Sequence, residues 1–570
     1  MEDDKQGQRM KAWIGPAIGM SLVMSVQAQA QFRPPTTANP LQNLPRVETP
    51  NAPRVNTQVQ TQAANPRLAA LLATQITPQR FDVTGVHAVP FKEIAALFTP
   101  MRGKTVTVGD VLAAAAKITV VYKAHGYALS FGYVPTQNFA DGTVHVTVVE
   151  GYVADVVIKG DAGNMERKIR AIAAHIVKDR PLRQKTFERY LQVLGMLPGI
   201  HVNANVPAPT TTDGATRLVI DVTRTRFNAT TGVDVNHPGV QGLTAVTENG
   251  FTPLSEQLTF STLLPSGPGD QRLYSLAYMQ PVGADGLMLH VSGSHYQGNP
   301  DTDNQLPSYL QQSMDQDQYA ISLSYPLLLD SRTNLTLTGG AYATDLQERY
   351  TNTVTGASVL QQYDLRVLDA KLDYVKAHDN STQKIDLEIA HGLNALGASA
   401  SVVTQVGNNV LVTPANAEFT RYDATFIQSN AWPQRFGTVF NITGQHSNDT
   451  LPTTEQISFG GPRYGLAYDP GETSGDSGWG ASIEVNRHYD LSNTWVRQVT
   501  PYIIGQFARV YLNVGVPSLA KLGTAGVGVR WTDKRYYAFD LTVAEPVGDV
   551  PMGAPHREPR VDFSFSYQLH

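Results

Sequence analysis

The side chains that carry out most covalent and metal chemistry in proteins are absent or scattered in this chain. There is no cysteine, which excludes disulfides, thiolate metal sites and cysteine nucleophiles. The 14 histidines are spread along the sequence. None of the patterns G-x-S-x-G, G-x-x-x-x-G-K-S/T and H-E-x-x-H occurs, so no nucleophile elbow, phosphate loop or zinc helix is indicated. We therefore predict no enzymatic activity, no cofactor and no metal site.

Two short stretches come closest to a binding motif. "DPGETSGD" (469–476) holds three carboxylates that could bind a cation, but it lacks the spacing of an EF-hand loop. A solvated loop rich in turn residues is the simpler interpretation. "GVGVRW" (526–531) is rich in glycine, but no helix follows it to bind a phosphate.

The composition indicates a β-rich protein of more than one domain. The chain has 570 residues, which exceeds the usual size of a single domain. Its 44 basic and 49 acidic residues are too balanced to suggest nucleic acid as a partner. Charged residues make up only 16% of the chain and glycine is abundant at 47, as in proteins built from short alternating strands.

The N-terminus has the pattern of a secretory signal peptide. Basic residues at 5, 9 and 11 precede an apolar core at about 13–26 and the small-residue site Ala28-Gln29-Ala30. An N-terminal membrane anchor is the alternative, but this core is short for a spanning helix. After the signal peptide (1–30), residues 31–77 are rich in Pro and Gln and predict an extended linker with a short helix at 66–75.

The next two segments, 78–151 and 152–224, share one order of predicted elements, β-α-α-β-β. In the first, Thr107 and Asp110 predict a capping box at the start of a helix over 107–127. Such a repeat of architecture constrains the fold more than any single motif.

From 225 to 570 the helical period gives way to alternating strands between turn residues. The last stretch, "RVDFSFSYQLH" (560–570), places five apolar side chains on one face and polar ones on the other. At about ten residues per strand, this region accommodates roughly sixteen spanning strands. We predict a transmembrane β-barrel here; a large soluble β-protein is the alternative.

Several motifs, in order along the chain, resemble one family. "YKAHGY", with Tyr122, Gly126 and Tyr127, resembles its Y-x-x-x-G-Y, and "LPGIHVNANV" (197–206) its L-P-G-V/I-x-V-x-A. "VTVVEGYVADVVIKG", "YMQPVGADGL" and "FGGPRYGLAYDPGETSGDSGWGASIEV" also stand where the family would place them. The chain thus resembles the two-partner secretion transporters of the ShlB/FhaC/HecB haemolysin secretion/activation type.

The resemblance implies a β-rich membrane protein in the outer membrane of a Gram-negative bacterium. A 16-stranded antiparallel transmembrane β-barrel would follow two periplasmic β-α-α-β-β (POTRA) domains. The barrel would export an unfolded partner polypeptide, expected to be a large β-helical protein, without ATP. Outer-membrane lipid and the machinery that inserts barrels would be its other partners. An assembly factor that inserts other barrels, or a porin or polysaccharide exit channel, is the alternative function.

Candidate cargo contacts in the second POTRA domain are Phe187, Leu191, Ile200 and Val202; for Phe187 and Leu191 a plain core role is the alternative. An extended cargo segment would add there as a strand.

The barrel departs from the family pattern at one place. In the family, a long loop folds back into the barrel, and an Arg in its R-G-Y/F motif pairs with an Asp on an inner strand. Here Leu466 and Gln506 stand at those two positions, while Tyr468 keeps the register. Arg463 is a candidate replacement for the missing Arg, or else a solvated loop residue. We therefore expect the loop to be held less tightly than in relatives. The chain also ends in His570 rather than an aromatic residue, so Leu569 or Tyr567 would serve as the terminal signal.

Overall fold

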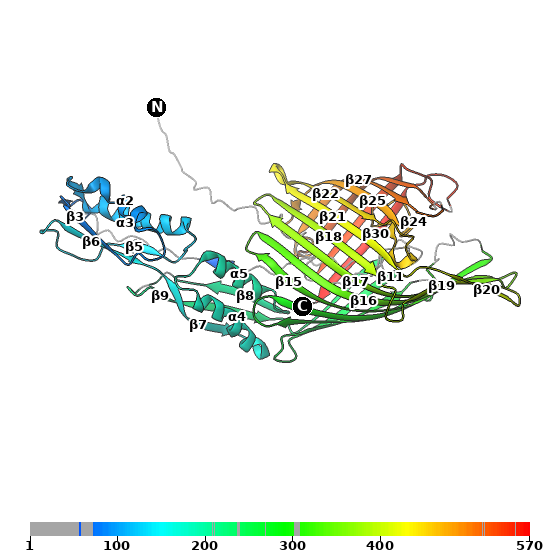
Figure 1. Ribbon diagram of the computed structural model, residues 1–570. Helices are drawn as coiled ribbons and strands as arrows, with labels where there is room; N and C mark the ends of the chain where they lie inside the picture. Colours follow the sequence, from blue (N-terminus) through cyan, green and yellow to red (C-terminus); the bar gives the residue numbers. More distant parts are fainter. Residues whose placement is uncertain are drawn as a thin grey trace, which may run out of the picture.

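The computed structural model describes residues 56–58, 72–207, 209, 211–235, 240–267, 269–300, 308–515, 517, 519–552 and 554–569. The predicted signal peptide, most of the predicted linker with its short helix, and His570 lie outside these residues. Figure 1 shows two small α/β units, one after the other, at one end of a large β-barrel.

The first unit packs two helices on a small sheet. Its elements are β2 (Gln75–Ile76), β3 (Arg80–Thr84), α2 (Phe91–Ala96), η4 (Thr99–Met101), β4 (Val106–Thr107), α3 (Val108–Ala124), β5 (Phe131–Tyr133) and β6 (Thr143–Val149). The sheet has the order β3-β6-β5, with β3 parallel to β6. The predicted capping box is confirmed, because Asp110 N donates to Thr107 Oγ1 and Thr107 N donates to Asp110 Oδ2.

The second unit repeats this order of elements. It comprises β7 (Tyr152–Gly160), η5 (Gly163–Met165), α4 (Glu166–Lys178), α5 (Gln184–Gly195), β8 (Ile200–Asn205) and β9 (Ala215–Arg224). Ile169, Ile172 and Ile176 recur at helical spacing on α4 and are fully buried against the sheet. The sheet order is β1-β8-β9-β7, in which β1 (Asn56–Gln58) comes from the N-terminal segment. None of the helices described is long and apolar enough to span a membrane.

Sixteen antiparallel strands form a closed barrel, as predicted, because the first pairs with the last. They are β10 (Phe227–Asp234), β11 (Gln241–Asn249), β12 (Gln257–Ser266), β13 (Arg272–Val282), β14 (Leu287–Gly298), β15 (Leu310–Leu329), β16 (Thr333–Asn352), β17 (Ser358–Ala377), β18 (Ser381–Gly392), β21 (Phe419–Ala431), β22 (Phe436–His446), β25 (Ser477–Arg487), β27 (Gln498–Tyr511), β28 (Lys521–Thr532), β29 (Tyr537–Pro546) and β30 (Arg560–Leu569). A hairpin of β19 (Ser399–Val406) and β20 (Asn409–Pro414) extends from the wall between β18 and β21, and the short β26 (Tyr489–Asp490) pairs with β27.

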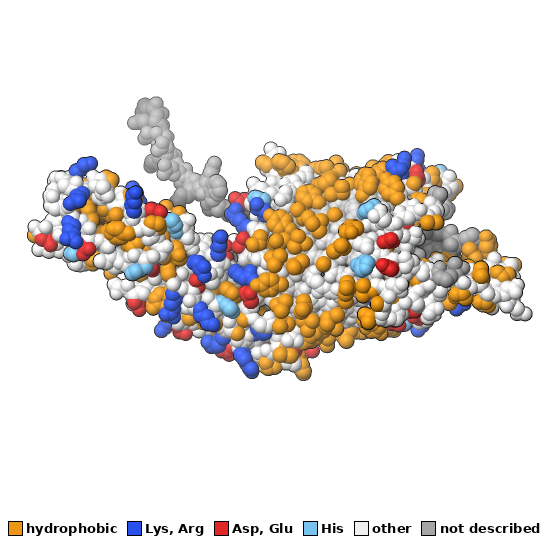
Figure 2. Space-filling view, viewed as in Figure 1, with side chains coloured by type: hydrophobic (Ala, Val, Ile, Leu, Met, Phe, Trp, Pro, Cys, Tyr) orange, Lys and Arg blue, Asp and Glu red, His pale blue; other side chains and the backbone are white. Residues whose placement is uncertain are grey.

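The barrel is apolar outside and polar inside. Along β15, Tyr319, Ile321 and Leu323 are exposed on the outer face, whereas Gln316 and Gln318 are buried on the inner one. Figure 2 shows hydrophobic side chains gathered over the barrel strands, while many lysines and arginines lie on the two N-terminal units. An outer face of this kind suits hydrocarbon, and closure leaves no strand edge unpaired within it.

The long connection between β22 and β25, residues 447–476, folds back into the barrel, and we call it the lumen segment. It contains η7 (Thr453–Glu455), β23 (Ile457–Phe459) and β24 (Thr473–Gly475). Phe459 and Tyr468 are fully buried, and they belong to one apolar cluster with wall residues such as Leu522. The lumen segment is therefore packed against the inner wall.

Candidate functional site: the lumen segment and the joints of the N-terminal units

A buried arginine of the wall holds the start of the lumen segment. Arg421 on β21 forms ion pairs with Glu455 of the lumen segment at 2.8 Å and with Glu388 of β18 at 2.8 Å. A third carboxylate, Asp423, lies 2.9 Å from Arg421 Nε. Tyr342 OH donates to Glu455 Oε2 at 2.9 Å. The family's charge pair is thus matched by one of opposite polarity, with the Arg on the wall and the acid on the loop.

Breaking the Arg421–Glu455 ion pair costs free energy, because both side chains are buried. Glu455 is fully buried and Arg421 is 3% exposed. Removing one member of such a pair leaves an uncompensated buried charge, which costs about 3–5 kcal/mol. The lumen segment can therefore leave the lumen only if water or another ligand replaces these contacts.

The structure brings the two predicted loop positions together without a charge pair. Leu466 N donates to the Oε1 atom of Gln506 at 2.9 Å, and Ala467 N lies 3.4 Å from Thr524 Oγ1. Gln506 thus holds the backbone of the lumen segment with a neutral hydrogen bond. Arg463 lines a polar cavity beside Gln506, and Asn441 and Thr425 line it too.

Two tyrosines fasten the rest of the lumen segment. Tyr468 OH donates to Asp549 O at 2.8 Å and accepts from Gly523 N at 3.3 Å. Tyr464 OH donates to Asn441 Oδ1 at 2.7 Å. The ring of Tyr464 packs against Gly480 of the wall. A Cβ at Gly480 would lie only 2.7 Å from the nearest ring atoms, so this close approach requires glycine.

The carboxylates of "DPGETSGD" serve the architecture of the lumen segment. Asp469 pairs with Arg560 of β30 at 2.6 Å, and Glu472 accepts from Asp469 N. Asp476 accepts from the backbone N–H groups of Leu451 and Asn513, both at 2.8 Å. The predicted solvated loop is therefore wrong, because Glu472 and Asp476 are 3% and 0% exposed and accept backbone hydrogen bonds inside the barrel.

In the first unit, the motif residue Tyr122 lies on α3 and meets a carboxylate. Tyr122 is fully buried, and its OH donates to Glu150 Oε1 at 2.7 Å. The same carboxylate accepts from the backbone N–H groups of His87 and Ala88. Burial alone would raise the pKa of Glu150, but these hydrogen bonds outweigh it and hold the pKa below its ordinary value.

The motif residues Gly126 and Tyr127 lie at the joint between the two units. Gly126 ends α3 at a φ of +86°, a conformation that favours glycine. Gln184 N of the second unit donates to Gly126 O at 2.7 Å, and Tyr127 forms an isolated β-bridge with Arg183. The motif thus explains how the two units are held together.

The variant Glu150→Gln is expected to destabilise the first unit by about 2 kcal/mol at pH 7, since hydrogen bonds to a charged group are worth about 1.5–3 kcal/mol. The lowered pKa means that this contribution is present above the unfolded pKa of Glu150 and is lost as the pH falls through the folded one. Hydrogen exchange of residues 108–124 in the full-length protein measures both effects. Glu93→Gln is the control, since the exposed Glu93–His125 pair should contribute little; equal exchange in the two variants would contradict the prediction.

The four predicted cargo contacts lie mostly inside the second unit. Leu191, Ile200 and Val202 are 2–3% exposed and belong to its core, and Phe187 packs against that core. Leu191, Ile200 and Val202 therefore cannot contact cargo in this conformation, whereas Phe187 is partly exposed. The alternate side chains His201 and Asn203 of β8 remain exposed.

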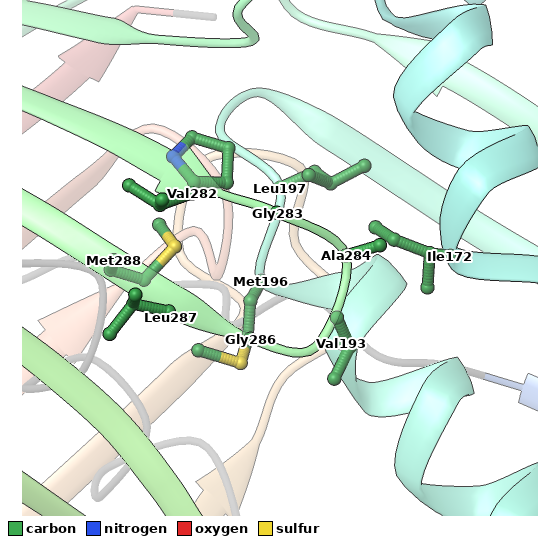
Figure 3. Close-up of a pocket in the computed structure, with 11 residues that line it drawn as sticks. Ile172, Val193, Met196, Leu197, Val282, Gly283, Ala284, Gly286, Leu287 and Met288 are labelled. Carbon is green, nitrogen blue, oxygen red and sulfur yellow. The ribbon is translucent and has the colours of Figure 1, made fainter. Parts of the chain in front are cut away.

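The second unit contacts one end of the barrel through the turn between β13 and β14. Figure 3 shows Gly283, Ala284 and Gly286 of this turn facing Ile172 of α4 and Val193 of α5. The apolar contact is tight, because a Cβ at Gly286 would stand 2.8 Å from Pro326 and 3.4 Å from Val193.

Polar contacts surround this apolar joint. Asp285 accepts from Tyr190 OH at 2.9 Å and from Tyr325 OH at 2.6 Å, and it pairs with Arg189 at 3.5 Å. Lys168 Nζ donates to the carbonyl oxygens of Pro281 at the end of β13 and of Gly283 in the turn, both at 3.0 Å. The orientation of the second unit is therefore fixed by α4 and α5 together.

Replacing Asp285 with Asn is expected to loosen the second unit, because it removes the ion pair with Arg189 and leaves one oxygen for two tyrosine donors. Spin-label distances between α5 and the barrel should broaden relative to the unaltered protein. Asp379→Asn, in an exposed pair with Arg332 on another turn, is the matched control. Unchanged distance distributions in Asp285→Asn would show that apolar packing alone holds the joint.

The sequence did not point to Arg421, Glu455 or Asp285. Alternation along β21 could have placed Arg421 inside, because Tyr422, Ala424 and Phe426 occupy the opposite face. No pattern pairs it with a loop residue 34 positions away.

Two family models match the chain. One, "POTRA domain, ShlB-type", matches residues 76–151. The other, "Haemolysin secretion/activation protein ShlB/FhaC/HecB", matches residues 250–528. Together they account for more than half of the chain.

Individual relatives are distant. The heme/hemopexin transporter protein HuxB of Haemophilus influenzae (strain 86-028NP) is 20% identical over 473 residues, 80% of each chain. The solved structure of CdiB from Escherichia coli covers 89% of this chain and 93% of its own, with a TM-score of 0.65 and 15% identity. CdiB from Acinetobacter baumannii covers 93% and 96%, with a TM-score of 0.58 and 15% identity.

A closed barrel with an apolar outer face, a POTRA domain before it and a segment folded into its lumen define an outer-membrane translocator of a partner protein. The POTRA end faces the periplasm. The chain belongs to the two-partner secretion transporters of the ShlB/FhaC/HecB type.

Proposed function

We propose that this translocator takes up its partner as an unfolded polypeptide in the periplasm and conducts it through the barrel without ATP. The observation that carries the proposal is the lumen segment. It fills a polar pore, and besides the ion pairs Arg421–Glu455 and Asp469–Arg560 it is held there by neutral hydrogen bonds such as that from Leu466 N to Gln506. An extended chain offers many backbone donors and acceptors, which can replace such bonds one at a time.

The two N-terminal units are proposed to be two POTRA domains over 78–151 and 152–224, followed by the barrel from 225. The shared β-α-α-β-β order supports this division. The second domain is proposed to capture cargo by strand addition along β8, since main-chain hydrogen bonds give affinity with little demand on sequence. The partner is proposed to be a large β-helical protein, because its folding outside the cell would make passage irreversible.

The Arg421–Glu455 ion pair then keeps the pore closed, and cargo must break it to pass; we call this contact the closure. Arg421 is the positioning residue of this closure, and Gln506, Leu466 and Tyr468 align the lumen segment on the wall. Arg463, beside Gln506 in the polar cavity, is proposed to meet the passing chain.

Deleting the transporter gene tests the function. The proposed partner, to be sought as a large β-helical protein encoded beside the transporter, should then accumulate in the periplasm, and its export should return with the full-length transporter. Export that continues without the transporter would refute the proposal. Failure of other barrels to assemble, with export of the partner intact, would favour an insertase instead.

A further inference from the structure

The outer edge of β8 already carries an added strand. Residues Asn56–Gln58 of the N-terminal segment pair with it in parallel, with Asn56 opposite Asn203 and Gln58 opposite Asn205. The other side of β8 pairs with β9 along its whole length. The edge proposed to receive cargo is therefore occupied by the chain itself.

The edge of β8 lacks the usual protection of a sheet edge. Natural edges are blocked by charged residues, prolines or bulges, and "IHVNAN" (200–205) has no proline, lysine, arginine or carboxylate and pairs with β9 without a bulge. Its side chains at 200, 202 and 204 point into the core and are fixed there. What blocks this edge is β1.

Within the described residues, the pairing of β1 covers the second half of β8. It spans three residues and pairs with 203–205, whereas β8 has six residues. The edge of 200–202 has no strand partner among the described residues. An extended segment that pairs along all six residues of β8 would make more main-chain hydrogen bonds than the three pairs described for β1, and could therefore displace it.

We propose that Asn56–Gln58 is a built-in occupant of the cargo edge, which an extended segment of the exported partner displaces. This inference rests on the proposed function and adds regulation to it. In the absence of cargo, β1 prevents the exposed edge of β8 from pairing with other unfolded proteins of the periplasm. Cargo with a longer extended segment gains access, because it can use all of β8.

The absence of cysteine allows a clean test. In the full-length variant Asn56→Cys/Asn203→Cys, the paired positions lie within reach of a disulfide. Oxidation should form it and lower export of the partner encoded beside the transporter at least tenfold, and reductant should restore export. Co-expressed partner should also lower the yield of the disulfide, since it competes for the edge.

The matched control locks another parallel pair. Asp82→Cys/His145→Cys joins β3 to β6 inside the first unit, where no displacement is proposed. It should export normally when oxidised. Failure of the disulfide at 56–203 to form, normal export from the locked 56–203 variant, or equal loss from both variants would overturn the inference. Lack of export by the unaltered chain would instead refute the proposed function, and the inference with it.

Discussion

The variant Arg421→Gln is expected to open the pore far more often than the unaltered protein. Loss of the guanidinium leaves Glu388, Asp423 and Glu455 close together without their shared cation. The easiest relief is to move the lumen segment, which carries Glu455, away from the wall. A loss of about 3 kcal/mol corresponds to a change of about a hundredfold in the open-to-closed ratio. Single-channel recordings in planar bilayers measure this ratio.

Arg530→Gln is the matched control. Arg530 pairs with Glu484 at 2.6 Å and Asp540 at 2.8 Å, and all three lie on wall strands. Its loss should disturb the wall without releasing the lumen segment. Equal opening of the two variants would mean that the lumen segment is not held by Arg421.

The second pair of positions offers a rescue. Adding Leu466→Arg and Gln506→Asp to Arg421→Gln should lower the open-to-closed ratio again. The two positions are close enough to pair, because Leu466 N already donates a hydrogen bond to the Gln506 side chain. Leu466→Arg alone would leave an unpaired charge and should not do so. Continued opening of the triple variant would show that a charge pair at this place cannot hold the lumen segment.

Deleting residues 78–224 is expected to abolish export while the barrel still assembles. The barrel closes its own strand edges, so it does not need the N-terminal units to satisfy its backbone. Capture of cargo would be lost together with β8. Export of the neighbouring secreted protein and heat-modifiable migration of the barrel read the two effects separately.

Asp285→Asn supplies a comparison for this deletion. It loosens the joint but keeps β8, so it should export more than the deletion variant does. Normal export by the deletion variant would rule out capture by the N-terminal units.

Periodicity alone predicted much of this fold. The change from a period of 3.6 to 2 near residue 225 separated the helical units from the barrel, and Thr107 with Asp110 located the start of α3. Strand alternation in "RVDFSFSYQLH" predicted its apolar outer face. These features are local, so neighbouring residues suffice to reveal them.

The candidate site was less predictable, because its contacts join distant segments. Glu455 of the lumen segment contacts Arg421 of the wall, and Asp285 of the barrel contacts Tyr190 of the second unit. The expectation of a loosely held lumen segment considered only Leu466 and Gln506. It did not include Arg421 on β21, which holds the lumen segment through Glu455. Likewise, Leu191 and Val202 have the composition of either a core or a groove, and only the packed structure shows them as core.

The joint at Asp285 has a mechanical consequence. A pull on a chain bound to β8 passes through α5 into Asp285 and Tyr325, and so loads the wall at β13, β14 and β15. The lumen segment is fastened to other strands, namely β16, β18, β21, β22, β27, β28 and β30. Tension on the captured chain therefore does not act directly on the contacts that hold the lumen segment. The lumen segment must therefore be released by the leading end of the cargo as it enters the pore. Capture of cargo at β8 and opening of the pore are thus mechanically separate.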